Sequence, residues 1–89
     1  MREPERIERI LHLLNTIWQQ QPDWRFNQLI SNLQNLYSQQ NNEYGRRKAI
    51  QKTDYGEVNS SYLDFFFLED DKWENFLVEI IDNMKSENE

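Results

Sequence analysis

Four carboxylates in the C-terminal third of the chain are of the residue type that metal binding and acid–base chemistry require: Asp64, Glu69, Asp70 and Asp71. Hard divalent cations take several carboxylate oxygens as ligands. The spacing differs from a calcium-binding loop, which alternates its ligands and needs a glycine and a distal glutamate. Acidic residues are also expected at a helix start, where the helix dipole favours negative charge. We therefore predict no metal site.

His12 is the single histidine of the chain. A general base needs a nucleophile or an orienting carboxylate within reach, and the residues around His12 form no Ser-His-Asp arrangement. With two glycines and no cysteine, the chain lacks a glycine-rich phosphate loop and a thiolate zinc site. The sequence thus predicts a protein that is not an enzyme, with no catalytic residues and no cofactor.

A short basic stretch lies in the middle of the chain and consists of Arg46, Arg47, Lys48 and Lys52. Cations bind phosphates, and the tyrosines on either side of the stretch could stack on bases. However, residues 62–89 carry nine acidic and two basic residues and would repel the same polymer. A solvated loop, or one that docks on an acidic partner, is favoured over nucleic-acid binding.

The run Phe65-Phe66-Phe67 is the strongest candidate for an interaction site. Three consecutive aromatic side chains cannot all point the same way in a strand or a helix. At least one should face away from the core unless the segment is covered on both sides. An exposed aromatic beside carboxylates such as Glu69 and Asp70 is typical of a binding hot spot. The alternative is that the polar loop or the first helix covers the run.

Length and composition indicate one domain, 1–89, with a modest core. The net charge is −6 and only 37% of residues are hydrophobic, but 13% are aromatic, which is typical of a folded chain. No apolar run approaches the roughly 20 residues that a membrane helix needs. The N-terminal residues do not resemble a signal peptide. We therefore expect no membrane association and a cytoplasmic location.

Helical periodicity predicts three helices, at 4–20, 23–38 and 70–85. Pro22-Asp23 predicts a tight turn, so that the first two helices form a helical hairpin against which the third packs. Residues 39–61 are polar, contain both glycines and predict a long flexible loop. Residues 62–68 form a Phe-rich segment that bridges the helices. The predicted fold is mainly α; the alternative adds a two-stranded ribbon formed by 49–55 and 62–67.

Two blocks of the chain resemble a family of small uncharacterised bacterial and phage proteins. One block is Trp18-x-x-x-Pro22-Asp23-x-Arg25-x-x-Gln28-Leu29-Ile30, and the other is Asp64-Phe65-Phe66-Phe67-Leu68-Glu69-Asp70. The resemblance covers about half of the chain and implies a bacterial or phage origin but no activity. Arg25 and Gln28 match the first block and are polar where helix packing does not require it, so they join the candidate interaction residues. The alternative is that they bond to the segment 64–71 and stabilise the fold.

These observations predict a non-catalytic protein-interaction module, such as an adaptor, regulator or inhibitor, whose protein partner is unknown. Self-association is a second possibility for its contacts. The alternative function is related to nucleic acid, either through the basic stretch 46–52 or through acidic mimicry of a nucleic acid.

Overall fold

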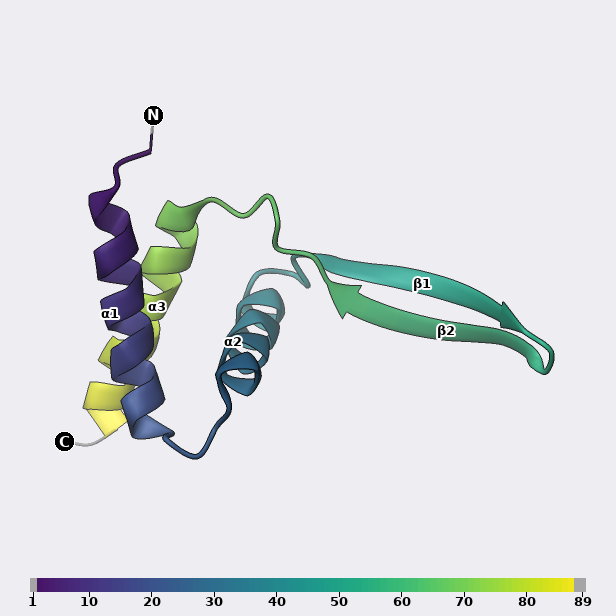
Figure 1. The fold of residues 1–89 in the computed structure, drawn as a ribbon, viewed down its shortest axis with the longest axis horizontal. Coiled ribbons are helices and arrows are strands. Elements are labelled where there is room, and N and C mark those ends of the chain that lie inside the picture. The colour runs from purple at the N-terminus through teal and green to yellow at the C-terminus, as the bar shows by residue number, and fades with distance from the viewer. Residues whose placement is uncertain (1, 88–89) are drawn as a thin grey trace. The chain divides into compact units, whose positions relative to one another are not determined.

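The computed structural model describes residues 2–87, and these contain three α-helices and one two-stranded antiparallel sheet (Figure 1). In chain order the elements are α1 (Glu5–Gln20), α2 (Phe26–Gln40), β1 (Arg46–Thr53), β2 (Gly56–Leu63) and α3 (Asp70–Glu87). The chain is therefore α+β, and the prediction of a mainly α, three-helix domain is wrong. The error lies in residues 39–61, which were predicted as a flexible loop and form most of a β-ribbon.

The ribbon was only the alternative prediction because almost all of its side chains are exposed on both faces. A strand with one buried face alternates apolar and polar residues, whereas a ribbon exposed on both faces shows no such period. β1 pairs with β2 from Arg46 opposite Leu63 to Thr53 opposite Gly56. The alternative prediction of a ribbon had the correct type of element but placed its strands at 49–55 and 62–67.

The turn between the two strands is held by local hydrogen bonds. The Thr53 hydroxyl donates to the Gly56 carbonyl at 2.9 Å and accepts from the Tyr55 backbone N–H at 3.2 Å. Gly56 has φ +124°, a conformation that residues with a side chain rarely adopt. A glycine at this place in a short loop is the one local sign of a hairpin that the sequence contained.

Two compact units make up the chain, one containing the residues up to Leu29 together with those from Leu68 onward, and the other Ile30–Phe67. In the first unit α1 and α3 lie side by side (Figure 1). α1 corresponds to the predicted helix 4–20, and α3 to the predicted helix 70–85. Several apolar side chains of the first unit are buried: Ile17, Leu29, Phe76, Leu77 and Ile81.

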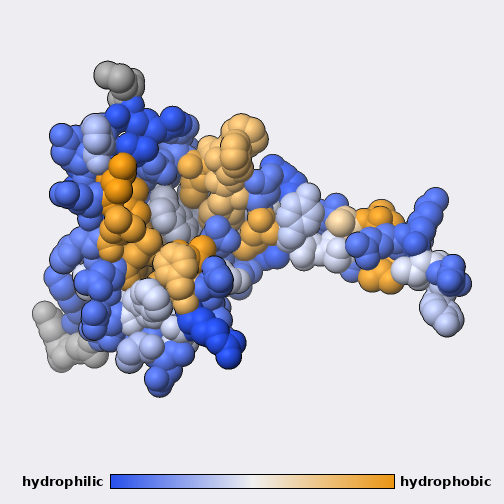
Figure 2. Space-filling view, in the orientation of Figure 1, coloured by the Kyte–Doolittle hydropathy of each residue, from blue (hydrophilic) through white to orange (hydrophobic). Residues whose placement is uncertain are grey.

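The apolar stripe of α1 is only partly covered. Ile17 is buried and Ile10 is half-buried, but Ile7 and Leu11 are exposed, and Figure 2 shows apolar surface running along α1. The helical period of α1 was therefore predictable, whereas the extent of its burial was not. Periodicity identifies a face, and the neighbouring element determines how much of that face is covered.

The connection from α1 to α2 is a turn fixed by aromatic contacts. The Trp18 indole N–H donates to the Trp24 carbonyl at 2.8 Å, and the Trp18 ring lies 5.6 Å from the Phe26 ring. α2 begins at Phe26, three residues after the predicted start at Asp23, because the chain is still turning there. The Gln28 side chain closes the helix start by accepting the Arg25 backbone N–H at 2.8 Å, as in half of a capping box.

Candidate functional site

The segment between β2 and α3 contains the phenylalanine run, and its first ring is an anchor. Phe65 is half-buried, and its ring centroid lies 5.5 Å from those of both Tyr37 and Tyr44. The two tyrosine rings lie 5.8 Å apart, and all three pairs meet edge to face. Edge-to-face geometry at this spacing is favourable because the positive edge of one ring meets the negative face of another.

Gly45 allows the Phe65 ring to pack closely against the backbone. It has φ +79°, and a Cβ atom at this position would lie 2.8 Å from the Asp64 carbonyl oxygen and 2.9 Å from the Phe65 ring. The Asp64 N–H donates to the Gly45 carbonyl at 2.8 Å, so the two backbones are in direct contact. Only glycine combines this backbone conformation with this close approach. The sequence showed Gly45 but gave no sign of what it would contact.

Phe66 and Phe67 project from this anchor into solvent. Their side chains are 85% and 80% exposed, and their rings meet edge to face at 5.0 Å. The Asp64 carboxylate accepts the Phe66 backbone N–H at 3.1 Å and so fixes the turn. Figure 2 shows apolar surface over this segment. The phenylalanine run is thus divided between one anchoring ring and two exposed rings.

Tyr37 is the buried member of the anchor cluster. Burial raises the pKa of the Tyr37 hydroxyl above its ordinary value, and the neighbouring charge of an ionised Tyr44 raises it further. A neutral phenol is therefore favoured at this position. Asn41 adds a polar contact, since its side-chain amide donates to the Tyr37 carbonyl at 2.9 Å.

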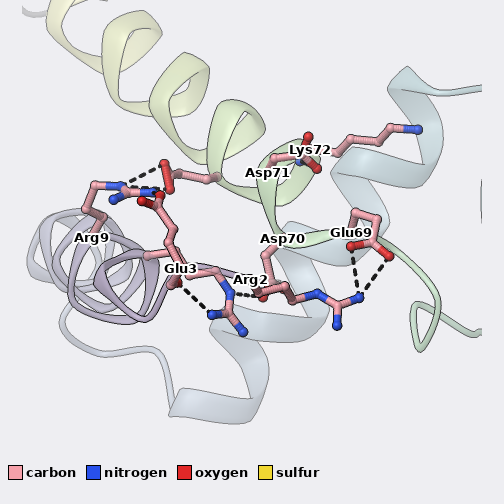
Figure 3. Close-up of polar contacts among 9 residues, drawn as sticks. Arg2, Glu3, Arg9, Glu69, Asp70, Asp71 and Lys72 are labelled. Atoms are coloured by element: carbon pink, nitrogen blue, oxygen red, sulfur yellow. Dashed lines mark hydrogen bonds and ion pairs between the residues drawn. The ribbon is translucent and has the colours of Figure 1, made fainter.

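Acidic residues at the start of α3 and just before it pair with arginines of α1 and of the residues that precede α1 (Figure 3). Arg2 donates to both oxygens of Glu69 at 3.0 Å, and the Arg6 Nε donates to Asp70 at 2.6 Å. These pairs join residues 67 and 64 positions apart in the chain. The candidate carboxylates Glu69 and Asp70 therefore form ion pairs within the first unit.

Arg9 completes this ladder of ion pairs. The Arg9 guanidinium donates to Glu74 at 3.1 Å and also to Glu3. Both hydrogen bonds raise the pKa of the guanidinium, and the one with Glu3 has the larger effect. An open pocket of about 310 Å³ lies among these side chains. Three arginines and five carboxylates line it, and four of the five carboxylates are paired with those arginines. Within residues 2–87 no group of histidines and carboxylates is arranged to hold a metal ion.

The arginines of the ladder were missed by sequence reasoning, which considered Arg25 as the partner of the acidic residues. Arg6 and Arg9 are three residues apart and share one face of α1, and Arg2 precedes Arg6 by four residues. That spacing was the available signal. Of the other two candidates, Gln28 caps α2 through the Arg25 backbone, and the Arg25 side chain is exposed.

The predicted basic stretch forms β1, where the strand divides its cations between two faces. Arg46, Lys48 and Lys52 share one face and Arg47 lies on the other, because side chains alternate along a strand. Arg46 also pairs with Glu43 at 3.2 Å.

His12 is exposed on α1, and its backbone carbonyl accepts a hydrogen bond from the Thr16 hydroxyl.

No protein-family description, curated protein or solved structure matches the chain. The resemblance to a bacterial and phage family thus stays a prediction. Within the described residues, no helix has both the length and the apolar character that crossing a membrane requires.

Proposed function

We propose that this protein is a non-catalytic interaction module that binds a protein partner through Phe66 and Phe67. The observation that carries the proposal is the exposure of two adjacent aromatic rings, 85% and 80%, beside a third ring that is anchored. Aromatic residues, phenylalanine included, are enriched at the cores of protein–protein interfaces, and exposed apolar patches mark interaction sites. Glu69 and Asp70 are not part of the proposed contact, since both are engaged by arginines.

Anchoring strengthens the proposal. The Phe65 ring and the Asp64 carboxylate fix the backbone on which the two exposed rings stand. A partner would therefore bind a surface that is already ordered, and less conformational entropy would be lost on binding. Each buried aromatic ring would remove roughly 150–250 Å² of surface from water.

Retention of partners from nuclease-treated lysate of the source organism tests this proposal. The wild-type chain is compared with the double variant Phe66→Ser/Phe67→Ser and with Tyr55→Ser. Tyr55 is a matched control because it is a fully exposed aromatic in the β1–β2 turn. The wild type and Tyr55→Ser should retain the same protein in stoichiometric amount, and the double variant should lose it.

The purified partner then allows the affinities to be measured. We expect the double variant to bind about 30-fold more weakly or worse, the equivalent of one hot spot of about 2 kcal/mol. Circular dichroism and thermal melting establish that the variant is folded, which the exposure of both rings leads us to expect. Equal binding by the double variant and the wild type would refute the proposal.

A nucleic-acid function through β1 is the second candidate. It is supported by the three cations on one face of the strand and by the exposed Tyr55 and Tyr62 of the same ribbon. Binding of this kind should weaken steeply with salt and should need Lys48 and Lys52. Salt-independent binding, or binding by Lys48→Gln/Lys52→Gln at wild-type strength, would exclude it.

A further inference from the structure

The β-ribbon has two free edges. β1 and β2 pair only with each other among the strands of residues 2–87 (Figure 1). Nearly every side chain of the ribbon is exposed. An isolated two-stranded hairpin is marginally stable in water, and a third or fourth strand usually stabilises it. An unpaired edge is also a template for pairing with another chain.

The two edges differ in charge. β1 carries four cations in its eight residues, and such a row of like charges keeps other strands from pairing with the edge. β2 has the sequence Gly-Glu-Val-Asn-Ser-Ser-Tyr-Leu and carries one charge, that of Glu57. Only the β2 edge is therefore open to pairing with a copy of itself.

The hydrogen bonds of the ribbon determine which backbone groups face that edge. The Asp64 N–H donates to the Gly45 carbonyl directly opposite. Hydrogen-bonded and non-hydrogen-bonded pairs alternate along an antiparallel ladder, so Val58, Ser60 and Tyr62 also direct their backbone groups to β1. The residues between them have outward-facing N–H and C=O groups: Glu57, Asn59, Ser61 and Leu63.

We propose that β2 pairs antiparallel with β2 of a second copy of this chain, about a two-fold axis at Ser60. With the axis at Ser60, each outward-facing residue lies opposite an outward-facing residue of the second copy. Residues 57–63 of one copy then pair with residues 57–63 of the other. Val58 then lies opposite Tyr62 of the second copy, a favourable cross-strand pair of a β-branched and an aromatic residue. Glu57 lies opposite a leucine, so no like charges meet.

The same arrangement on the other edge is unfavourable. A β1–β1 pair centred on Ala49 would place Arg46 of each copy opposite Lys52 of the other copy. Like charges directly opposite one another destabilise a sheet. The proposed assembly is a four-stranded sheet with β2 strands in the middle and the cationic β1 strands outside, which leaves no uncharged edge for further growth.

A single cysteine at the two-fold axis tests the proposal. The chain has no cysteine, so Ser60→Cys introduces the only thiol. In the proposed pairing two copies of residue 60 face each other with Cα atoms about 4.5 Å apart, within disulfide range. The matched control is Ala49→Cys, because Ala49 lies opposite Ser60 within the ribbon and on the same face.

Mild oxidation should cross-link Ser60→Cys to twice the 11.0 kDa chain mass on a non-reducing gel, and leave Ala49→Cys largely monomeric. Equal or preferential cross-linking of Ala49→Cys would overturn the proposal. So would a monomer mass for the wild type at every concentration in light scattering coupled to size exclusion.

Proline substitutions on the two edges give an independent measurement. Asn59→Pro removes an N–H at the proposed interface, and Ile50→Pro removes the equivalent outward N–H of the residue opposite. Asn59→Pro should raise the dimer dissociation constant at least about tenfold. Ile50→Pro should leave the dissociation constant unchanged, and equal effects of the two substitutions would overturn the proposal.

Phe66→Ser/Phe67→Ser should leave the dimer intact. The dimer proposal and the proposed function can therefore fail separately.

Discussion

The α1–α3 pair and the β1–β2 ribbon are stabilised in different ways. The helices bury apolar side chains such as Leu77 and are joined by ion pairs between residues more than 60 positions apart. The ribbon consists of strands adjacent in sequence, and it relies on its backbone ladder and its turn. The helix pair thus depends on long-range contacts, whereas the ribbon is a local structure with surfaces left free for binding.

This difference bears on where function can lie. Segments with few buried contacts open at low free energy and are the usual sites of binding and rearrangement. The ribbon meets this description, whereas the ion-paired start of α3 does not. Substitutions that compare the two regions directly can test the contrast.

The largest effect is expected from Leu77→Ala. Leu77 is 0% exposed, so truncation leaves a cavity and should lower the free energy of unfolding by about 2–5 kcal/mol. Ile50 in β1 is 63% exposed, and Ile50→Ala should change it by no more than about 0.5 kcal/mol. Urea titration followed by far-ultraviolet circular dichroism measures both. Similar losses would mean that the ribbon is part of the same core.

The same contrast explains what the sequence could predict. The three helices were found because an amphipathic period is a local signal of an element with one buried face. The ribbon was predicted only as an alternative and with other bounds. Neither of its faces is buried, so its strands Arg46–Thr53 and Gly56–Leu63 lack alternation. Only the glycine at its turn indicated a hairpin.

The candidate site was predictable in part for a similar reason. A run of three phenylalanines must expose some of its rings, and that argument needs no tertiary information. Which ring is the anchor depends on Tyr37, Tyr44 and the close approach at Gly45, and these contacts arise only in the folded chain. The pairing of Glu69 and Asp70 with arginines was likewise a long-range outcome.

A smaller effect is expected at the two glycines. Gly45 lies at the anchor of the exposed rings and Gly56 lies at the ribbon turn, so their substitution compares these two places. Gly45→Ala should cost about 2–3 kcal/mol, because it adds a clash with the Asp64 carbonyl and Phe65 to an unfavourable φ. Gly56→Ala meets no atom within 4 Å and should cost about 1–2 kcal/mol from φ alone.

Hydrogen exchange at the Asp64 N–H, which is bonded to the Gly45 carbonyl, distinguishes the two glycine variants. Gly45→Ala should accelerate this exchange strongly, and Gly56→Ala should affect mainly the amides near the turn. If Gly45→Ala left the exchange unchanged, the anchor of Phe65 would not depend on the close approach of the two backbones.

The smallest effect is expected from the ion pairs of the helices. The Arg6–Asp70 pair is partly buried, with side chains 25% and 43% exposed, whereas Arg2–Glu69 is open to solvent. A double-mutant cycle of Arg6→Gln and Asp70→Asn should give a coupling of up to about 1 kcal/mol, and the cycle for Arg2 and Glu69 a value near zero. The coupling energy from the cycle does not include the separate interaction of Asp70 with the helix dipole, because that interaction is lost equally with and without Arg6.

Salt provides the control for these cycles. In about 1 M salt the coupling of the exposed Arg2–Glu69 pair should vanish, while part of the Arg6–Asp70 coupling should persist because a partly buried pair is screened less. Arg46→Gln serves as the matched variant in the ribbon, since its pairing with Glu43 spans only three residues and should leave the unfolding of the helices unchanged. Equal coupling in both cycles would mean that burial does not distinguish the two pairs, and the ladder would then contribute to α1–α3 packing only through its apolar stems.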